Sequence, residues 1–150
     1  MKTLFIALVF TMVITPCAVA QSGLVTLPSK YSVADTTDKL EAAVKSEPEF
    51  LIFGRIDYSA IAAAQGAKVR PTQLLLFGRG RALQSLLSAA PTLAIDLPLK
   101  ALIWEDGSGK VWISYNTAEF LTERHSAQGI DKLLKQITDR TASFVKKAIE

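Results

Sequence analysis

The sequence predicts an α/β (α+β) domain built on a mainly antiparallel sheet of about five strands. Three observations predict this class. Short apolar and β-branched runs alternate along the chain with stretches of helical periodicity. Two of these runs flank an Asp-Gly-Ser-Gly sequence, which is typical of a β-hairpin turn. The segment 130–148 carries apolar residues at helical spacing, as expected of a helix that packs on a sheet.

The first twenty residues are expected to be a secretory signal peptide. Lys2 provides a basic start, and the apolar run Leu4–Ile14 is too short to span a bilayer comfortably. Ala18-Val19-Ala20 has the small-x-small pattern that signal peptidase reads. We therefore expect cleavage after Ala20 and a periplasmic or secreted product, in which residues 21–150 form a single globular domain.

Cysteine and charge content narrow the function classes. Cys17 is the one cysteine and leaves with the predicted signal peptide, so the exported domain has neither a disulfide nor a thiolate nucleophile. The alternative is a lipoprotein signal that would lipidate Cys17, although the preceding proline fits that signal badly. Without Lys2, 16 basic residues face 14 acidic residues, and this balance excludes the dense basic surface of a nucleic-acid binder. No second apolar segment of about twenty residues follows, so no membrane partner is expected after cleavage.

The first half of the domain predicts a strand, a helix, a strand and a helical turn. Leu24–Leu27 is a short strand. A helix begins after Ser32, a suitable N-cap, and ends before Pro48. Phe50–Tyr58 has the aromatic and β-branched content of a strand, and the alanine-rich Ser59–Gln65 predicts a short helical turn.

The second half predicts a strand, a helix, a hairpin and two more helices. An almost wholly apolar strand is followed by a glycine-rich break and a helix. The predicted elements are the strand Gln73–Phe77, the helix Arg81–Ala89, the hairpin Ala94–Asn116, the helix Thr117–Arg124 and a long helix from Ile130.

The hairpin is expected to turn through a two-residue loop. Gly107-Ser108 suits a type II′ turn, because glycine accepts positive φ at the first central position. This register places Glu105 opposite Lys110, an attractive cross-strand pair, and Trp104 opposite Val111.

The same register assigns the two tryptophans to opposite faces of the hairpin. Leu102 and Trp104 would pack on helices, whereas Ile103 and Trp112 would lie on the other face. A face that mixes large apolar and polar side chains is often a self-association surface. Ile103 and Trp112 are therefore the predicted interface residues of a homodimer.

Six segments, in this order and spacing, resemble the bacterial family called domain of unknown function 302. The resemblance covers most of residues 24–137. The segments are Ile56-Asp57-Tyr58, Pro71–Gly78, Ala94–Lys100, Trp104-Glu105-Asp106, Val111-Trp112 with Ser114-Tyr115-Asn116, and Arg124-His125.

The resemblance implies a two-layer sandwich, with helices on one face of an antiparallel sheet, and a homodimer. It implies no activity. The chain departs from the family pattern at three places: Tyr58 stands where a histidine is usual, Arg79-Gly80 replaces an Asn-Pro-like pair, and Ser126 stands where glycine is common. A family site that used a histidine at position 58 would lack its imidazole here.

His125, the single histidine, is a candidate catalytic residue. An imidazole is the natural general base near neutral pH, or one metal ligand. The alternative is a capping or packing role near a helix end. No metal site is expected, because the exported domain has no second histidine and no cysteine.

Asp57 and Asp96 are the candidate partners of His125. Each lies where a strand meets a break, so each is either a cap for backbone N–H groups or part of a site. In the functional interpretation, Asp57, Asp96 and His125 converge, and Arg55 or Lys100 binds an anionic group.

Arg79 and Arg81 are candidates for an anion contact. Gly78-Arg79-Gly80-Arg81 follows a strand and precedes a helix, where backbone N–H groups can hold an anion. The third glycine of a dinucleotide fingerprint is absent, since Leu83 stands there, and no P-loop ending follows. No cofactor is expected.

The leading hypothesis is a non-enzymatic, exported binding module. Its ligand would be a small anionic or amphipathic molecule held near Arg55, Asp57, Lys100 and His125. Two alternatives stay open: an acid–base enzyme that uses His125 with Asp57 or Asp96, and a structural partner-binding protein.

Overall fold

The chain is described from a computed structural model that places residues 23–150. The predicted signal peptide, with Cys17, lies outside the described residues. The described part contains, in chain order, β1 (Leu24–Ser29), α1 (Val33–Lys45), β2 (Phe50–Asp57), α2 (Tyr58–Ala64), β3 (Thr72–Arg79), the 3-10 helix η1 (Gly80–Ala82), α3 (Leu83–Ala89), the 3-10 helix η2 (Pro91–Ile95), β4 (Leu99–Glu105), β5 (Val111–Asn116), α4 (Ala118–His125) and α5 (Asp131–Ile149).

The five strands form one antiparallel sheet in the order β1-β5-β4-β3-β2. This arrangement confirms the predicted α+β class. β1 reaches its edge position by pairing with β5, with Leu24 opposite Asn116. Pro28 lies inside β1 rather than after it. An edge strand tolerates proline, because its missing N–H removes no bond from the interior of the sheet.

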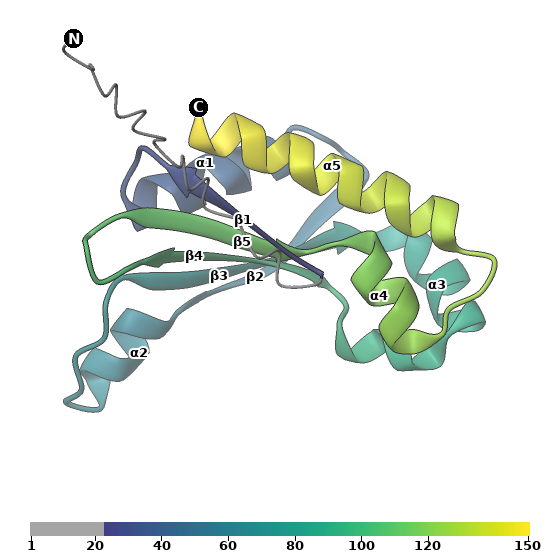
Figure 1. Ribbon diagram of the computed structural model, residues 1–150, viewed down its shortest axis with the longest axis horizontal. Coiled ribbons are helices and arrows are strands. Elements are labelled where there is room, and N and C mark those ends of the chain that lie inside the picture. The colour runs from purple at the N-terminus through teal and green to yellow at the C-terminus, as the bar shows by residue number, and fades with distance from the viewer. Residues whose placement is uncertain (1–22) are drawn as a thin grey trace, which may run out of the picture.

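The core lies between the sheet and the two long helices, α1 and α5, which cover one of its faces (Figure 1). The predicted apolar face of α5 is buried, including Leu134, Ile137 and Phe144. The Phe144 ring meets Phe50 edge-on at 5.0 Å between centroids and Phe77 at 6.4 Å. Edge-on aromatic contacts of this kind add to the stabilisation that burial alone provides.

The hairpin loop contains three residues rather than the predicted two. The N–H of Asp106 donates to the carbonyl of Lys110 at 2.9 Å, and the N–H of Gly109 donates to the carbonyl of Asp106 at 3.1 Å. Gly109 has φ +82°, the left-handed conformation that closes a three-residue hairpin loop. The Asp106 carboxylate also accepts from the N–H groups of Ser108 and Lys110, which fixes the loop from inside.

The longer loop shifts the pairing of β4 and β5 by one residue. Trp104 lies opposite Trp112, and Glu105 lies opposite Val111 instead of the predicted lysine. A slip of one residue sends every side chain of one strand to the opposite face. Ile103 is consequently 0% exposed in the core, and Trp104 lies on the outer face with Trp112. The predictions that Ile103 faces a partner and that Trp104 packs in the core are wrong.

Gly109→Ala is expected to destabilise the domain more than Gly107→Ala. A side chain at the positive φ of Gly109 costs about 1–2 kcal/mol, whereas Gly107 has no positive φ. A Cβ at Gly107 would meet only the Arg70 guanidinium, at an ordinary 3.7 Å. Urea unfolding of both variants checks this order. A two-residue type II′ loop would give the reverse order, with Gly107 the sensitive position.

One end of the sheet gathers η2, β4 and α4. Ala94 and Ile95, expected in the hairpin, belong instead to η2, so β4 begins only at Leu99. Thr117 caps α4 by accepting from the N–H of Phe120 at 3.2 Å. η2 and α4 lie together at the end of the sheet away from α2 (Figure 1). This packing brings Asp96, just after η2, to His125 at the end of α4.

Candidate functional site

The face of the sheet away from α1 and α5 is largely open (Figure 1). Its side chains alternate with the buried ones along each strand, except at a β-bulge between Ile52 and Gly54 of β2. Lys100 is the one charged side chain among the outward-facing strand residues that the structure describes. We call this surface the open face; it comprises Leu24, Thr26, Pro28, Leu51, Gly54, Ile56, Thr72, Leu74, Leu76, Lys100, Leu102, Trp104, Trp112, Ser114 and Asn116.

A hollow of about 290 Å³ lies on the open face, and we call it the Lys100 hollow. Its lining is chemically divided, with an apolar wall and a polar rim. The wall is formed by Leu24, Leu74, Leu102 and Trp104, and the rim by Thr26, Lys100, Ser114 and Asn116. Tyr115 also borders the hollow, but it alternates with Ser114 and Asn116 along β5 and is only 8% exposed in the core, where burial raises the pKa of its phenol.

Hydrogen bonds between side chains fix the floor of the Lys100 hollow. The indole Nε1 of Trp104 donates to the Ser114 hydroxyl at 3.1 Å, and that hydroxyl also meets the Thr26 hydroxyl at 2.9 Å. The Trp104 ring stacks against Trp112, with centroids 6.3 Å apart and an angle of 25° between the rings. The wall is therefore held in one conformation before any ligand arrives.

Trp112 is held in turn by the hairpin loop. Its indole Nε1 donates to the Asp106 carboxylate at 2.7 Å, and the Lys110 ammonium lies 4.1 Å from its ring centroid. Hydrogen bonds from the hydroxyl of Ser108 and from Trp112 hold the pKa of Asp106 well below its usual range. The carboxylate is thus ionised, and it holds the hairpin loop and the Trp112 ring in place.

A second cluster joins the end of α4 to η2. The Asp96 carboxylate accepts from His125 Nε2 at 2.7 Å and forms an ion pair with Arg124, whose Nε lies 3.2 Å away. The other imidazole nitrogen, Nδ1, lies 3.0 Å from the Thr92 hydroxyl. Because the Asp96 carboxylate only accepts, the short contact places a proton on Nε2, and Nδ1 shares a hydrogen bond with the Thr92 hydroxyl. The His125 side chain is only 4% exposed.

The two clusters are neighbours through Lys100. The Lys100 ammonium donates to the backbone carbonyl of Asp96 at 2.9 Å. A small hollow of about 10 Å³ lies beside Asp96 and shares Lys100, Tyr115 and Asn116 with the Lys100 hollow. Its volume is that of about one water molecule. The structure therefore brings three of the predicted site residues together: Lys100, Asp96 and His125.

Asp57 and Arg55 lie elsewhere. Asp57 caps α2 by accepting from the N–H of Ala60 at 2.9 Å, and the Gln73 amide donates to it at 2.9 Å. Arg55 donates to Gln73 at 2.7 Å and forms an ion pair with Asp38 of α1. These contacts satisfy both charged groups within the fold.

The predicted convergence of Asp57 with Asp96 and His125 is wrong. Asp57 pairs with Gln73 near the start of β3, whereas Leu99, which begins β4 just after Asp96, pairs with Phe77. Four residues of strand separate these positions, or about 13 Å along the sheet. Asp57 and Asp96 lie toward opposite ends of the sheet, so no small substrate could touch both carboxylates.

Arg79 and Arg81 do not form the predicted anion cradle. Arg79 is the last residue of β3 and pairs with Glu49. Arg81 lies in η1, an exposed residue of a three-residue 3-10 helix. The helix α3 starts only at Leu83 and has no side-chain cap. The two arginine side chains therefore extend from a strand end and from a tight turn. Neither lies on a loop that leads into a helix N-terminus.

Comparison with known proteins assigns the family. The profile of the family described as "Domain of unknown function DUF302" matches residues 25–148. The chain belongs to this family. A solved DUF302 protein, described as "uncharacterized conserved protein DUF302 from Bacillus stearothermophilus", superposes with a TM-score of 0.75 and covers 85% of this chain and 98% of its own. At 15% sequence identity this likeness shows the fold alone.

Curated relatives of this DUF302 chain carry another name. Two proteins named "Fluoride-specific ion channel FluC 1", from Brucella suis biovar 1 and Brucella abortus biovar 1, are each 38% identical over 132 residues. The match covers 87% of this chain, and 52% and 48% of those two proteins. The chain thus spans about half the length of the curated relatives it matches.

The described residues of the DUF302 chain hold neither a membrane-spanning helix nor a cluster of metal ligands. Between Gly23 and Glu150, none of the helices is long and apolar enough to cross a membrane. Within the same residues, no three His, Cys, Asp or Glu side chains are grouped so that they could hold a metal ion.

Sequence reasoning missed most of the Lys100 hollow. Leu74, Leu102 and Trp104 read as core residues, because an apolar strand residue is usually buried. Their true position follows from the loop length. A three-residue loop with Gly109 in the left-handed conformation was the signal that would have placed Trp104 beside Trp112.

The stability of this DUF302 domain is expected to fall in acid partly through Asp57. Hydrogen bonds from Ser59, Ala60 and Gln73 lower the pKa of Asp57 from 3.8 to about 2. Because the folded-state pKa lies below the unfolded one, the stabilisation is complete above about pH 4 and is lost as the pH falls toward 2. Solvent screening keeps its size below about 1 kcal/mol. Urea unfolding of wild type and Asp57→Asn should show a gap that closes over this range; a gap that is constant with pH would contradict the assignment.

Proposed function

We propose that this DUF302 domain is a non-enzymatic binding module that holds a small amphipathic anion in the Lys100 hollow. The observation that carries the proposal is the division of its lining into an apolar wall and a rim with one cation. An acyl or aryl group would displace water from Leu74, Leu102 and Trp104. A carboxylate, sulfonate or phosphate would meet Lys100. The volume of about 290 Å³ lies at the lower end for small-molecule sites, so the ligand is small.

Lys100 can serve a ligand without leaving its present partners. Its ammonium donates to the carbonyl of Asp96 at 2.9 Å and more weakly to that of Ile95 at 3.5 Å. An ammonium group has three protons, so one stays available for an anion. The two carbonyls act as a clamp that holds the charge at the rim, which lowers the entropy lost on binding.

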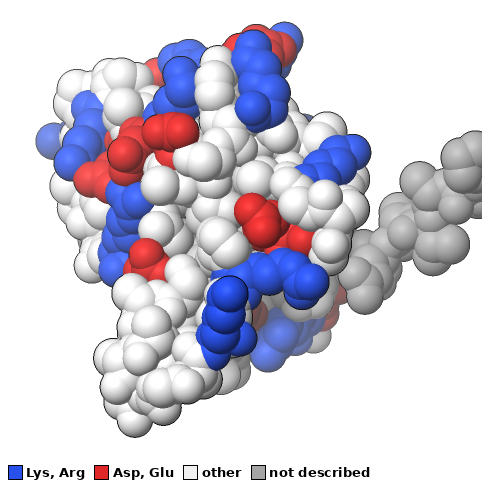
Figure 2. All heavy atoms as spheres, turned by 90° about the vertical axis from the view of Figure 1, so that its left-hand side faces the viewer, with Lys and Arg blue, Asp and Glu red and all other residues white. Residues whose placement is uncertain are grey.

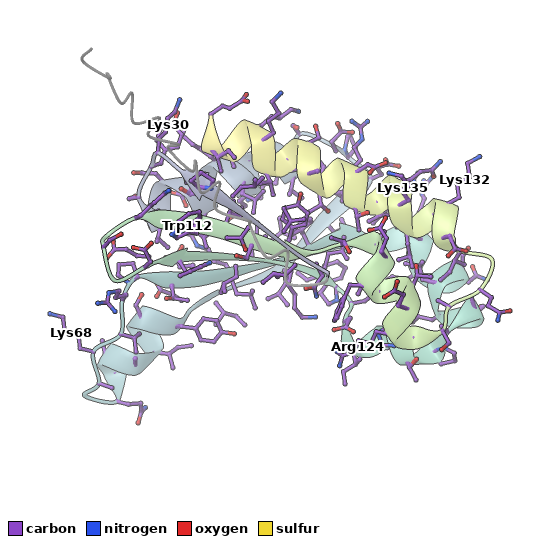
Figure 3. The ribbon with its side chains drawn as sticks, viewed as in Figure 1. Lys30, Lys68, Trp112, Arg124, Lys132 and Lys135 are labelled. Carbon is purple, nitrogen blue, oxygen red and sulfur yellow. The ribbon has the colours of Figure 1, made fainter. Side chains whose placement is uncertain are left out.

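Titration with 8-anilinonaphthalene-1-sulfonate tests the proposal. This probe has an aryl body and one sulfonate, and bound probe would quench the fluorescence of the tryptophans. Lys100→Ala is expected to weaken binding about tenfold, the effect of one charge-assisted hydrogen bond. Lys132→Ala is the matched control, because this lysine is exposed and lies on α5, which covers the opposite face of the sheet from the hollow (Figure 3).

An unchanged affinity in Lys100→Ala would contradict the role of the cation. Leu102→Ser tests the apolar wall by the same titration, and it should weaken the probe while leaving the fold intact, because Leu102 is only half-buried. If the wild-type protein binds no probe at millimolar concentration, the binding role itself fails.

We also propose that the domain is exported after cleavage at Ala20 and that it forms a homodimer through Trp112 on the open face. Native mass spectrometry of the protein from its own host reports three quantities together. The chain mass gives the cleavage site and any lipid on Cys17, the complex mass gives the oligomeric state, and an excess mass reveals a bound ligand. Light scattering of Trp112→Ser tests the interface, since a dimer unaffected by this change would overturn it.

An acid–base role for His125 is the second candidate, and one observation favours it. Thr92, His125 and Asp96 form a chain of two hydrogen bonds, of 3.0 and 2.7 Å, in the order of nucleophile, base and orienting carboxylate. Thr92 is exposed, so a substrate could reach it. p-Nitrophenyl acetate would acetylate the Thr92 oxygen, release p-nitrophenolate and pass the hydroxyl proton to His125. Mass spectrometry of the peptide that contains Thr92 decides: an unmodified peptide in wild type, or equal labelling in His125→Gln, rejects this candidate.

Channel activity is not extended to this chain. The name of the Brucella relatives refers to proteins of which the match covers about half. We propose the binding role only for the part of those proteins that this chain matches. The fluoride-specific name describes the whole Brucella proteins.

A further inference from the structure

The helix α2 is an anomaly in a folded domain. It spans Tyr58–Ala64, none of its residues is buried, and its sequence Tyr-Ser-Ala-Ile-Ala-Ala-Ala has no charged residue. Tyr58 is 42% exposed and Ile61 is 54% exposed. A surface helix ordinarily hides an apolar stripe and shows charges to water. The sequence of α2 does neither, so its exposed apolar side chains call for a partner outside the domain.

The loop after α2 continues this surface. Every residue from Gln65 to Pro71 is exposed, and Val69 is 48% exposed. We call residues 58–71 the α2 lobe. It carries two cations, Lys68 and Arg70, and no acidic residue. Figure 1 shows the lobe projecting from the sheet on the side away from α1 and α5, and Lys68 lies at its outer end (Figure 3).

The end view of the molecule in Figure 2 shows this uncharged surface next to basic side chains. The lowest projection in Figure 2, formed by the α2 lobe, is uncharged over most of its surface, with basic side chains beside it. Arg70 lies next to Gly107 of the hairpin loop, which also carries Lys110. Two acids beside the lobe are engaged within the fold: Asp57 by Ser59, Ala60 and Gln73, and Asp106 by Ser108 and Trp112. A third, Glu105, bonds to Pro71 through its N–H, but it pairs with the buried Val111 and so points to the other face of the sheet.

We propose that the α2 lobe docks on an anionic lipid surface. Ile61, Val69 and Tyr58 enter the boundary between headgroups and acyl chains, and Lys68 and Arg70 contact the lipid phosphates. The sequence predicted no membrane partner because it has no second long apolar segment. That criterion applies to helices that span a membrane and not to a short lobe that binds at its surface. The charges of the lobe, two cations and no acid, complement an anionic lipid surface, whereas the open face of a second copy would offer the lobe only another cation, Lys100.

The lobe is well suited to this task because the fold does not depend on its apolar side chains. Asp57 caps α2, and the N–H of Ala67 returns to the carbonyl of Ala62 at 2.9 Å, with Gly66 at φ +75°. These contacts shape the lobe through its backbone. Side-chain substitutions in it should therefore change binding and leave thermal stability unaltered.

Co-sedimentation with vesicles tests the proposal. The full chain is mixed with vesicles of phosphatidylglycerol and phosphatidylcholine, or of phosphatidylcholine alone. Wild type is expected to bind the anionic vesicles and to lose affinity in high salt. Ile61→Glu should weaken this binding at least tenfold, and Lys68→Ala with Arg70→Ala should weaken it roughly thirtyfold, at about 1 kcal/mol for each cation.

Ile95→Glu is the matched control. Ile95 is 70% exposed, more than Ile61, but lies in η2 at the other end of the sheet. Its replacement should leave vesicle binding unchanged. All variants carry the same N-terminal segment, so any affinity of that segment for lipid cancels. The proposal is overturned if wild type fails to bind the anionic vesicles, or if Ile61→Glu and Ile95→Glu lose affinity equally. If Ile61→Glu instead alters the mass by light scattering without any vesicle binding, the lobe is an interface between copies.

Discussion

Phe144→Ala is expected to lower the free energy of unfolding by about 3–5 kcal/mol, the usual cost of deleting a fully buried aromatic ring. Phe144 is 0% exposed and packs its ring against Phe50 of β2 and Phe77 of β3. The substitution removes the aromatic contact of α5 with β2 and β3 and leaves a cavity that rigid strands cannot close. Urea unfolding monitored by circular dichroism measures the effect.

Lys147→Ala is the control for this experiment. It lies three residues further along α5, on the exposed side. The change should alter stability by less than about 0.5 kcal/mol. A loss below about 1.5 kcal/mol in Phe144→Ala would mean that the α5 interface is looser than described, and that the open face is not supported by a firm core.

The long C-terminal helix was predictable because its signal is local and repeated. Leu134, Ile137, Phe144 and Val145 recur at helical spacing over many turns, and burial of one face is the one arrangement that satisfies them. The strands were predictable as elements for the same reason. The fold class followed from the order of these elements, which leaves few ways to build two layers.

The hairpin register was not predictable from the hydrophobic pattern alone. In β4, both alternating sets are largely apolar: Leu99, Ala101 and Ile103 on one face, Leu102 and Trp104 on the other. Register is strongly specified only where one face is polar. The register of β4 against β5 therefore depended on whether the loop has two or three residues. The hydrogen bonds that the Asp106 carboxylate accepts inside the loop favour three.

The site was half predictable. Lys100, Asp96 and His125 were named because they stand at the ends of elements, and the structure gathers them. Asp57 satisfies the same local rule, yet it lies at the other end of the sheet. Which strand ends meet depends on strand order and direction, and these are set by contacts between residues far apart in the sequence.

Asp96→Ala is expected to cost about 2–3 kcal/mol of stability. The Asp96 side chain is 14% exposed, accepts from His125 and forms an ion pair with Arg124. Its loss leaves Nε2 of the nearly buried His125 imidazole without a partner, and hydrogen bonds to charged groups contribute about 1.5–3 kcal/mol. The segment η2 should loosen from α4 at the same time. Hydrogen exchange of the amides of Asp96 and Leu97, which bond to Leu93, reports this local change.

A double-mutant cycle with His125→Ala separates the pair from its surroundings. The double variant should be less destabilised than the sum of the two single variants by about 1–2 kcal/mol, because a buried group without a partner exists only in the singles. Thr92→Val is the control, since its hydroxyl meets the same imidazole at an exposed position and should matter little. Full additivity of Asp96→Ala and His125→Ala would show that the two side chains do not act together. A strong coupling would mean that the pair holds the backbone of Asp96 in position. The Asp96 carbonyl in turn positions the ammonium of Lys100 at the rim of the hollow.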